Sequence, residues 1–298
     1  MTENGYAWVR MDSQPRTLNF HDVQRRFDHA AGSFDRVDFV HRETCDGLMN
    51  RLTPMVIDAK RVLDLGGATG SASRPLRKRF RRSRVIVLDA SHEMLRSAER
   101  KQSWLSRVST LQCNAIEIPL QDGCIDLAFS NLLLPWINDL QTVFAEVARV
   151  LRKGGLFVFS TLGPDSLSEL REAWASVDEQ EHVNTFADMH DVGDGLVRAG
   201  LRDPVLDTDF LKVSYRDTAS LFRDLTLLGA RNCLAGRART LTGKQRFQDM
   251  ENRLRSRFKD GLLRLRLELV YGHAWGGGPL QPAGEYRLDA AEIGRRQT

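Results

Sequence analysis

The chain has 298 residues, enough for one large α/β domain with additions or for two small domains, and only one nucleotide-binding pattern occurs along it. A net charge of +4 and an isoelectric point near 9.0 indicate an acidic partner only weakly, and we expect no nucleic-acid partner. No apolar run approaches the ~20 residues of a membrane span, and the N-terminus lacks the apolar stretch of a secretion signal, so we expect no membrane contact. The four cysteines are scattered, which suits a reducing compartment and predicts no zinc site. We therefore expect a cytoplasmic protein.

The first predicted element is helical and covers residues 18–53. Apolar residues such as Phe27, Phe34 and Val40 recur there about every 3.5 positions, the spacing of one face of a helix. Because this segment precedes the first strand, we expect it to lie as a lid across a ligand cleft at the edge of the sheet.

A short apolar run at residues 61–65 predicts a buried parallel strand. The loop after it holds four small residues, Gly66, Gly67, Ala68 and Gly70. The next segment, SASRPLRKRFRR, has helical spacing, and strand, glycine loop and helix form the unit that holds nucleotides in open α/β sheets. Glycine lets a ligand approach the main chain closely. Asp64, near the end of the strand, is placed to reach the amino group of an amino-acid-bearing cofactor.

The sequence of this loop does not indicate NAD as its ligand. The dinucleotide fingerprint is G-x-G-x-x-G, whereas the chain reads G-G-A-T-G-S from Gly66. A second predicted strand, residues 85–89, ends in Asp89, where a carboxylate accepts hydrogen bonds from a ribose diol. A third, residues 108–113, leads to Asn114, whose amide can pair with a base edge.

Two more strands complete the predicted parallel core. They span residues 124–129 and 155–161, and the helix LQTVFAEVARVL lies between them, closed by the K-G-G sequence at 153–155. The fourth strand leads to Asn131. Trp136, just beyond, either walls the ligand cleft or packs against the next helix.

The C-terminal half continues with a helix for which Asp165 is a plausible cap, then a second helix, and then an alternating strand over 203–215. The second helix starts in D-M-H-D-V-G-D, and we interpret its acidic and histidine side chains as helix-start capping and solvation rather than as metal ligands. Those side chains are Asp188, His190, Asp191 and Asp194. The expected divisions of the chain are a lid at 1–55, a cofactor-binding core at 56–215, a basic helical insert at 216–262, a final core strand at 263–275 and a disordered tail at 276–298.

Charge is concentrated in the insert. Between Arg231 and Arg266 there are eleven basic and three acidic residues, a net charge of +8. Such a surface either attracts an acidic protein or is an ordinary solvated helix face.

The sequences D-L-G-G-A-T-G, V-L-D-A-S, C-N-A-I-E-I-P-L and D-L-A-F-S-N, in this order over residues 61–162, resemble the class I S-adenosylmethionine-dependent methyltransferases. The resemblance implies an α/β fold with a Rossmann-like sheet, helices on both of its faces, and S-adenosylmethionine as the cofactor. It implies cofactor contacts from Asp64, Gly66, Ala68, Gly70, Asp89, Ala90, Asn114, Ala115 and Asn131.

Three positions depart from that family's usual sequence. Gly67 and Ala68 replace a Cys-Gly pair, and the Ala68 methyl group is expected to lower cofactor affinity, although a negative φ there would be tolerated. Asn114 stands where Asp is common, so the acceptor is kept and the charge is lost.

Later sequences are more discriminating. F-S-T-L-G-P-D-S-L-S-E-L-R-E-A-W, D-L-T-L-L-G-A-R-N and L-V-Y-G-H-A-W resemble the BioC family of malonyl-acyl-carrier-protein O-methyltransferases, and this likeness covers about residues 22–275. It implies O-methylation of the free carboxylate of a malonyl thioester in biotin biosynthesis, with acyl carrier protein or coenzyme A as the carrier. A carboxylate is already ionised at neutral pH, so the lack of an obvious catalytic base fits this acceptor.

Four residues are candidates for positioning the acceptor: Phe34, Thr161, Arg231 and Asn232. Phe34 stands where this family often has Tyr, so ring stacking is kept and a hydroxyl is lost. Two alternatives stay open at this point: a relative of the methyltransferase-like complex I assembly factors that acts on a protein partner, and a binding module of the same fold without catalysis.

Overall fold

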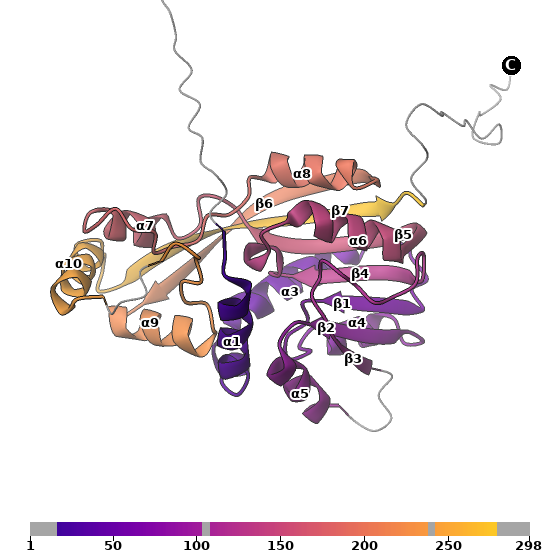
Figure 1. The fold of residues 1–298 in the computed structure, drawn as a ribbon, viewed down its shortest axis with the longest axis horizontal. Helices are drawn as coiled ribbons and strands as arrows, with labels where there is room; N and C mark the ends of the chain where they lie inside the picture. Colours follow the sequence, from indigo (N-terminus) through magenta and orange to yellow (C-terminus); the bar gives the residue numbers. More distant parts are fainter. Residues whose placement is uncertain (1–16, 103–107, 238–241, 279–298) are drawn as a thin grey trace, which may run out of the picture.

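The computed structural model describes residues 17–102, 108–237 and 242–278. Its centre is one seven-stranded sheet in the order β3-β2-β1-β4-β5-β7-β6 (Figure 1). The first five strands are parallel, and β7 is antiparallel to both of its neighbours. The strands are β1 (Arg61–Leu65), β2 (Arg84–Asp89), β3 (Val108–Gln112), β4 (Ile125–Asn131), β5 (Leu151–Leu162), β6 (Leu201–Tyr215) and β7 (Leu263–Gly276).

The helices occupy the connections between these strands. They are α1 (Phe20–Ala30), α2 (Phe34–Val37), α3 (Phe39–Leu52), α4 (Ser73–Arg79), α5 (His92–Arg100), the 3-10 helix η1 (Leu134–Trp136), α6 (Leu140–Val150), α7 (Ser168–Ala175), α8 (Met189–Arg198), α9 (Thr218–Leu227) and α10 (Lys244–Arg255). In the part of the chain that the structure describes, no helix has both the length and the apolar character to cross a membrane.

Both faces of the sheet are covered, as alternation along β5 shows. Phe157 and Phe159 belong to a buried cluster with residues of α6 and α8, whereas Leu156 and Val158 belong to a cluster with residues of α3 and α4. Side chains that alternate between two apolar layers are typical of a doubly wound α/β sheet. The predicted Rossmann-like fold with helices on both faces is therefore confirmed.

Two local predictions on the C-terminal side of the core are wrong. Strand β5 begins at Leu151, directly after α6, so the K-G-G sequence lies inside the strand, where the pairing with β4 shifts register and Gly154 has a φ of +71°. Asp165 does not cap α7, because the N-cap position belongs to Leu167 and the Asp165 carboxylate pairs with Arg266 at 2.6 Å.

Other local predictions are confirmed. The Asp188 carboxylate accepts from the His190 N–H at 2.8 Å and caps α8. The predicted tail begins one residue too early, since Gly276 is still in β7, and residues 279–298 of that tail lie outside the described residues.

Strands β6 and β7 extend beyond the rest of the sheet, and Figure 1 shows α7, α9 and α10 gathered around that extension. Leu263 and Leu265 of β7 pack there in a buried cluster with residues of these three helices. The insert is helical in α9 and α10. Between them, residues 233–235 run antiparallel to residues 17–19, with main-chain hydrogen bonds of 2.8 Å from Asn19 to Cys233 and from Ala235 to Thr17. This pairing, which we call the lid–insert bridge, joins the start of α1 to the insert.

Candidate active site

A small cavity of about 80 Å³ lies where β1, β2 and β4 end. Seven of the nine predicted cofactor contacts line it: Gly66, Ala68, Asp89, Ala90, Asn114, Ala115 and Asn131. Helix α1 supplies Phe20, Val23, Gln24 and Phe27 to the same cavity. The carboxyl ends of the strands and the predicted lid therefore meet at one site.

The glycine loop forms the floor of this cavity, and its main chain is already hydrogen bonded. The N–H groups of Gly66 and Gly67 donate to the Leu88 carbonyl at 2.8 and 3.0 Å, and the Ala68 N–H donates to Asp89 Oδ2 at 2.9 Å. The loop thus offers a surface without side chains rather than unpaired N–H donors. Ala68 does not have the negative φ that an alanine would tolerate there, because its φ is +45°.

Asp89 is held rigidly at the end of β2. Its second carboxylate oxygen accepts from the Ser91 N–H at 2.8 Å. Burial raises the pKa of Asp89 to about 6, and the two main-chain donors act in the opposite direction. An oriented carboxylate with lone pairs still available at the cavity wall can accept hydrogen bonds from the hydroxyls of a ribose.

Two of the predicted cofactor contacts do not line the cavity. Asp64 is 1% exposed, and its carboxylate lies beneath the loop, 3.5 Å from Ser73 Oγ. Burial, with a contribution from the Asp89 charge, raises the pKa of Asp64 to about 7. Gly70 faces Ala98 of α5. Their contact with a cofactor stays a prediction.

Asn131 ties the lid to the sheet. Its amide nitrogen donates to the His41 carbonyl at 2.8 Å, and its amide oxygen accepts from the Ser160 hydroxyl at 2.8 Å. The His41 ring packs edge-on against Phe34, with 4.9 Å between ring centres, and its Nδ1 is buried without a hydrogen-bond partner in the described part of the chain. Burial lowers the pKa of His41 to about 4, so the ring is neutral at physiological pH.

Helix α1 is fastened over the small cavity by polar contacts. The Asp28 carboxylate accepts from the Ser91 hydroxyl at 2.5 Å and from the Glu93 N–H at 3.2 Å, at the N-terminus of α5. The Gln24 side chain donates to the Ala90 carbonyl at 2.8 Å. These contacts account physically for the lid that the sequence predicted.

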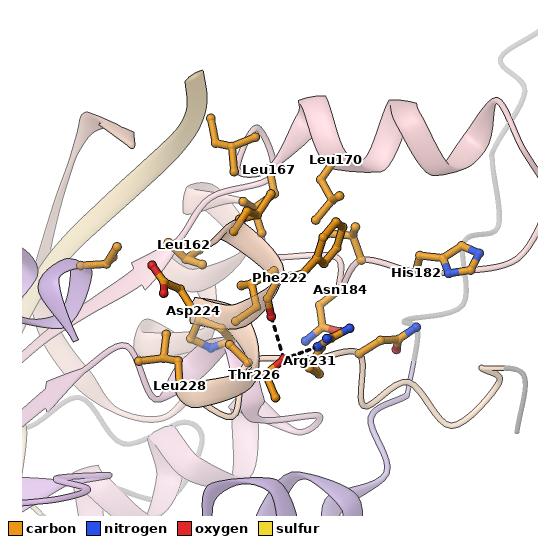
Figure 2. A pocket seen from close by; sticks show the side chains of 18 of the residues that line it. Leu162, Leu167, Leu170, His182, Asn184, Phe222, Asp224, Thr226, Leu228 and Arg231 are labelled. Atoms are coloured by element: carbon orange, nitrogen blue, oxygen red, sulfur yellow. Dashed lines mark hydrogen bonds between the residues drawn. The ribbon is translucent and has the colours of Figure 1, made fainter. Parts of the chain in front are cut away.

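A large cavity of about 600 Å³ lies between the sheet and the insert. Its walls are mostly apolar and include Leu162, Leu167, Leu170, Trp174, Val183, Leu221, Phe222, Leu225, Leu228, Phe247 and Leu265. Figure 2 shows several of these side chains, with Arg231 Nε donating to Thr226 Oγ1 at 2.8 Å among them. An elongated, mainly apolar ligand with one polar end suits such a cavity.

The two cavities share a wall made by His41, Leu132 and Trp136. Trp136 stands edge-on to Phe27 of α1, with 5.1 Å between ring centres and an interplanar angle of 90°. Trp136 was expected either to form a wall of the ligand cleft or to pack against the next helix, and it forms the cleft wall. Ligands in the two cavities would meet at this wall.

The four predicted acceptor-positioning residues are not all brought together. Arg231 and Asn232 line the large cavity, Phe34 lines the small cavity, and Thr161 is buried in β5 opposite Val270 and lines neither. The Asn232 amide already donates to the Glu181 carbonyl and accepts from the Leu234 N–H. Positioning of an acceptor by these residues stays a prediction.

Sequence reasoning missed His41 and Arg26, which both line the large cavity. A histidine one position after Val40, within the apolar pattern of the lid, was the available signal for His41. Nothing local marks Arg26 among the several arginines near it, because its position at the cavity depends on the insert, some 200 residues further along the chain.

Comparison with known proteins agrees with this geometry. Residues 63–159 match the family described as "Methyltransferase domain". The malonyl-acyl-carrier-protein O-methyltransferase of Halorhodospira halophila is 42% identical over 92% of this chain and 95% of its own, and that of Laribacter hongkongensis is 43% identical over 85% and 88%. The fold resembles the YcgJ protein of Bacillus subtilis, with a TM-score of 0.58, 16% identity and coverage of 78% of this chain and 98% of that one. The chain belongs to the malonyl-acyl-carrier-protein O-methyltransferase family.

Proposed function

We propose that the protein transfers a methyl group from S-adenosylmethionine to the free carboxylate of a malonyl group carried on acyl carrier protein. The observation that carries this proposal is the pair of cavities with a shared wall at His41, Leu132 and Trp136. One cavity ends at the glycine loop and Asp89, and the other is large enough and apolar enough for a thioester arm. The sequence relatives named for this reaction support the choice of acceptor.

The residues of the small cavity fit the cofactor. Asp89 supplies an oriented acceptor for a ribose, Asn114 supplies an amide for a base edge, and the loop from Gly66 to Ala68 leaves room for close approach. Ligand sites of this size usually enclose ~300–1,000 Å³. Because the small cavity holds about 80 Å³, we infer that α1 moves outward when the cofactor enters.

S-adenosylmethionine supplies a methyl group bonded to a positively charged sulfur. The transfer breaks that sulfur–carbon bond and forms a carbon–oxygen bond to the acceptor carboxylate, in line, so the protein's main task is to hold the reacting atoms close and aligned. A carboxylate with an ordinary pKa near 4 has no proton to lose at neutral pH, and no side chain has to act as a base.

His41 suits this environment because it carries no charge. A protonated imidazole at the shared wall would repel a cationic methyl donor, whereas the lowered pKa of His41, to about 4, keeps the ring neutral. The donor charge and the acceptor charge can then attract one another across the wall.

Acyl carrier protein is favoured over coenzyme A by the position of the basic insert. Phe247 of α10 lines the large cavity, and three exposed basic residues of α10 and the segment after it have no carboxylate within ion-pair distance in the described ranges. They are Lys244, Arg253 and Lys259. An acidic carrier could dock on them while its thioester arm enters the cavity. The four cysteines are free thiols, which suits our placement of the reaction in the cytoplasm.

The decisive experiment incubates the protein with S-adenosylmethionine that carries a labelled methyl group and with malonyl carrier protein. We expect the label on the carrier as a methyl ester that mild alkali removes, and no label on carrier that bears an acetyl group. A malonyl carrier that stays unlabelled, while another acceptor becomes labelled, would refute the proposal.

A further inference from the structure

Two arginines from distant parts of the chain face the large cavity. Arg26 comes from α1 and Arg231 from the segment after α9. The two segments touch at Gly229, whose φ of +79° lets its backbone pack on α1, since a Cβ there would lie 3.1 Å from the Arg26 carbonyl oxygen. This close approach brings together the two segments that carry the arginines, and both side chains line the same cavity.

Neither guanidinium has a carboxylate within ion-pair distance among the described residues. Arg26 Nε is buried without a hydrogen-bond partner in that part of the chain. Arg231 Nε donates to the Thr226 hydroxyl, a neutral group, and its guanidinium lies 5.7 Å from the centre of the Phe222 ring. Burial and the charge of Arg26 lower the pKa of Arg231.

The nearby acids are already engaged. Asp22 of α1 pairs with Arg25 at 3.0 Å and with Arg237. Asp224 accepts from the Tyr215 hydroxyl. Asp22 also acts on Arg26 through its charge, and Asp224 and Glu181 line the same cavity. Two guanidinium groups of like charge at a largely apolar wall nevertheless favour a bound anion, because neither forms an ion pair among the described residues.

We propose that Arg26 and Arg231 together bind the free carboxylate of the acceptor, an inference that rests on the proposed function. Guanidinium groups bind carboxylates through paired, charge-assisted hydrogen bonds. Arg26 and Arg231 line the same cavity as His41, Leu132 and Trp136 of the shared wall, so a carboxylate held by the pair lies in the cavity that borders the small one.

This assignment gives the arginine pair a role in specificity and in turnover. Thioesters without a distal carboxylate, such as an acetyl thioester, have no charge to offer. Methyl transfer removes the same charge, because the product is a neutral ester. The pair therefore distinguishes substrate both from shorter thioesters and from product, and the product leaves a site that holds two unpaired cations again.

The test measures the dissociation constant of malonyl-pantetheine by calorimetry, with S-adenosylhomocysteine present so that no transfer is needed. This probe keeps the carboxylate and lacks the phosphate of the natural arm. We expect Arg26→Gln and Arg231→Gln each to weaken its binding by about tenfold to a hundredfold. Arg26→Lys and Arg231→Lys should recover part of the loss, and the affinity for S-adenosylhomocysteine should change by less than about twofold.

Arg25→Gln is the matched control, because Arg25 is on the same helix, pairs with Asp22 and does not line the cavity. It should bind the probe as the unmodified protein does. The Gln variants should also lose the preference for malonyl-pantetheine over its methyl ester.

Gln variants that bind malonyl-pantetheine normally would overturn the inference, and so would a defect confined to ligands that carry the phosphate. If the unmodified protein binds the probe through the pair but transfers no methyl group, the proposed function fails and the anion site stands. If both Gln variants transfer the methyl group normally, the arginine pair does not bind the carboxylate, and the proposed function is unaffected.

Discussion

Ala68 is a non-glycine residue of the glycine loop with a left-handed backbone. Glycine tolerates a positive φ, whereas alanine in the left-handed region costs roughly 1 kcal/mol, and Ala68 has a φ of +45°. Its N–H donates to Asp89, so the strained residue is also the one that fixes the carboxylate at the cavity. The strain therefore lies in the wall of the small cavity, the candidate cofactor site.

We expect Ala68→Gly to raise the free energy of unfolding by up to about 1 kcal/mol, because the strain is removed and only part of the gain is lost to a more flexible unfolded chain. Urea unfolding measures the change. Ala145→Gly, in the exposed middle of α6, is the control and should lower the same quantity by about 1 kcal/mol. Equal losses in both variants would contradict strain at Ala68.

Asp89→Ala should weaken S-adenosylmethionine binding by ~1 to 3 kcal/mol, since a hydrogen-bond acceptor for the ribose is lost. It also leaves the Ala68 and Ser91 N–H groups without their acceptor, so the loop loosens. Calorimetry gives the affinity. Asp46→Ala, at an exposed site on α3, should leave it unchanged, and an unaffected Asp89→Ala would mean that this carboxylate is not a cofactor ligand.

At the residue scale, the sequence identified the side chains that follow strands and missed those that depend on distant contacts. Asp89 and Asn131 could be predicted because parallel strands end at one edge of a sheet. The buried Nδ1 of His41 and the cavity-facing Arg26 could not, because burial at each arises from tertiary packing.

Among the elements, the parallel strands were the most predictable. Strand β1 matches its prediction at both ends, because Val62, Leu63 and Leu65 are apolar and a glycine loop follows them. Strand β5 starts four residues early, since Lys153–Gly154–Gly155 has the composition of a turn but forms a bulge inside the strand. The sequence thus predicted which elements exist better than it predicted where they begin.

The insert was the least predictable element. Its charge was evident, yet six of the eleven basic residues between Arg231 and Arg266 pair with acids in the structure, so the net charge overstates the surface available to a partner. The pairing acids are mostly distant in sequence, for example Glu172 with Arg257. Lys244 and Arg253 of α10 are exposed basic residues outside those pairs.

The double variant Lys244→Gln/Arg253→Gln removes two positive charges from α10. It should raise the KM for malonyl carrier protein by about threefold to tenfold, because favourable long-range electrostatic attraction is lost. The KM for malonyl-coenzyme A should not change, and the sensitivity of the carrier reaction to salt should decrease. Steady-state kinetics at two salt concentrations measures both.

The control for α10 is Arg77→Gln/Lys78→Gln on α4, which carries a similar charge at the end of the helix away from the glycine loop. If that pair produced the same effect, net charge rather than a docking surface would be responsible.

For the whole molecule, burial of Asp64 predicts a pH dependence of stability. Its pKa is raised from 3.8 to about 7 in the folded chain, so below pH 4 both states are protonated and the contribution is fully present. As the pH rises from 4 to 7 the unfolded chain ionises first, and stability on the order of 4 kcal/mol is lost.

Asp64→Asn removes this titration, so its advantage in free energy of unfolding over the unmodified protein should grow between pH 5 and pH 8 in the absence of cofactor. Urea titrations at each pH measure it. His41, whose pKa is lowered to about 4, contributes with the opposite sign, and the comparison of the two proteins cancels its contribution. Asp89 contributes with the same sign as Asp64 and is coupled to it, so the difference reports the pair of carboxyls. Parallel pH profiles would contradict a buried, protonated Asp64.

The lid–insert bridge makes the two binding events interdependent. Because the strand-like residues 17–19 hold residues 233–235, α1 cannot swing away from the glycine loop without pulling on the segment that carries Arg231. An acceptor bound in the large cavity would therefore hinder the outward movement of α1 that admits the methyl donor. We expect an ordered mechanism, in which S-adenosylmethionine binds before the malonyl substrate and S-adenosylhomocysteine dissociates last.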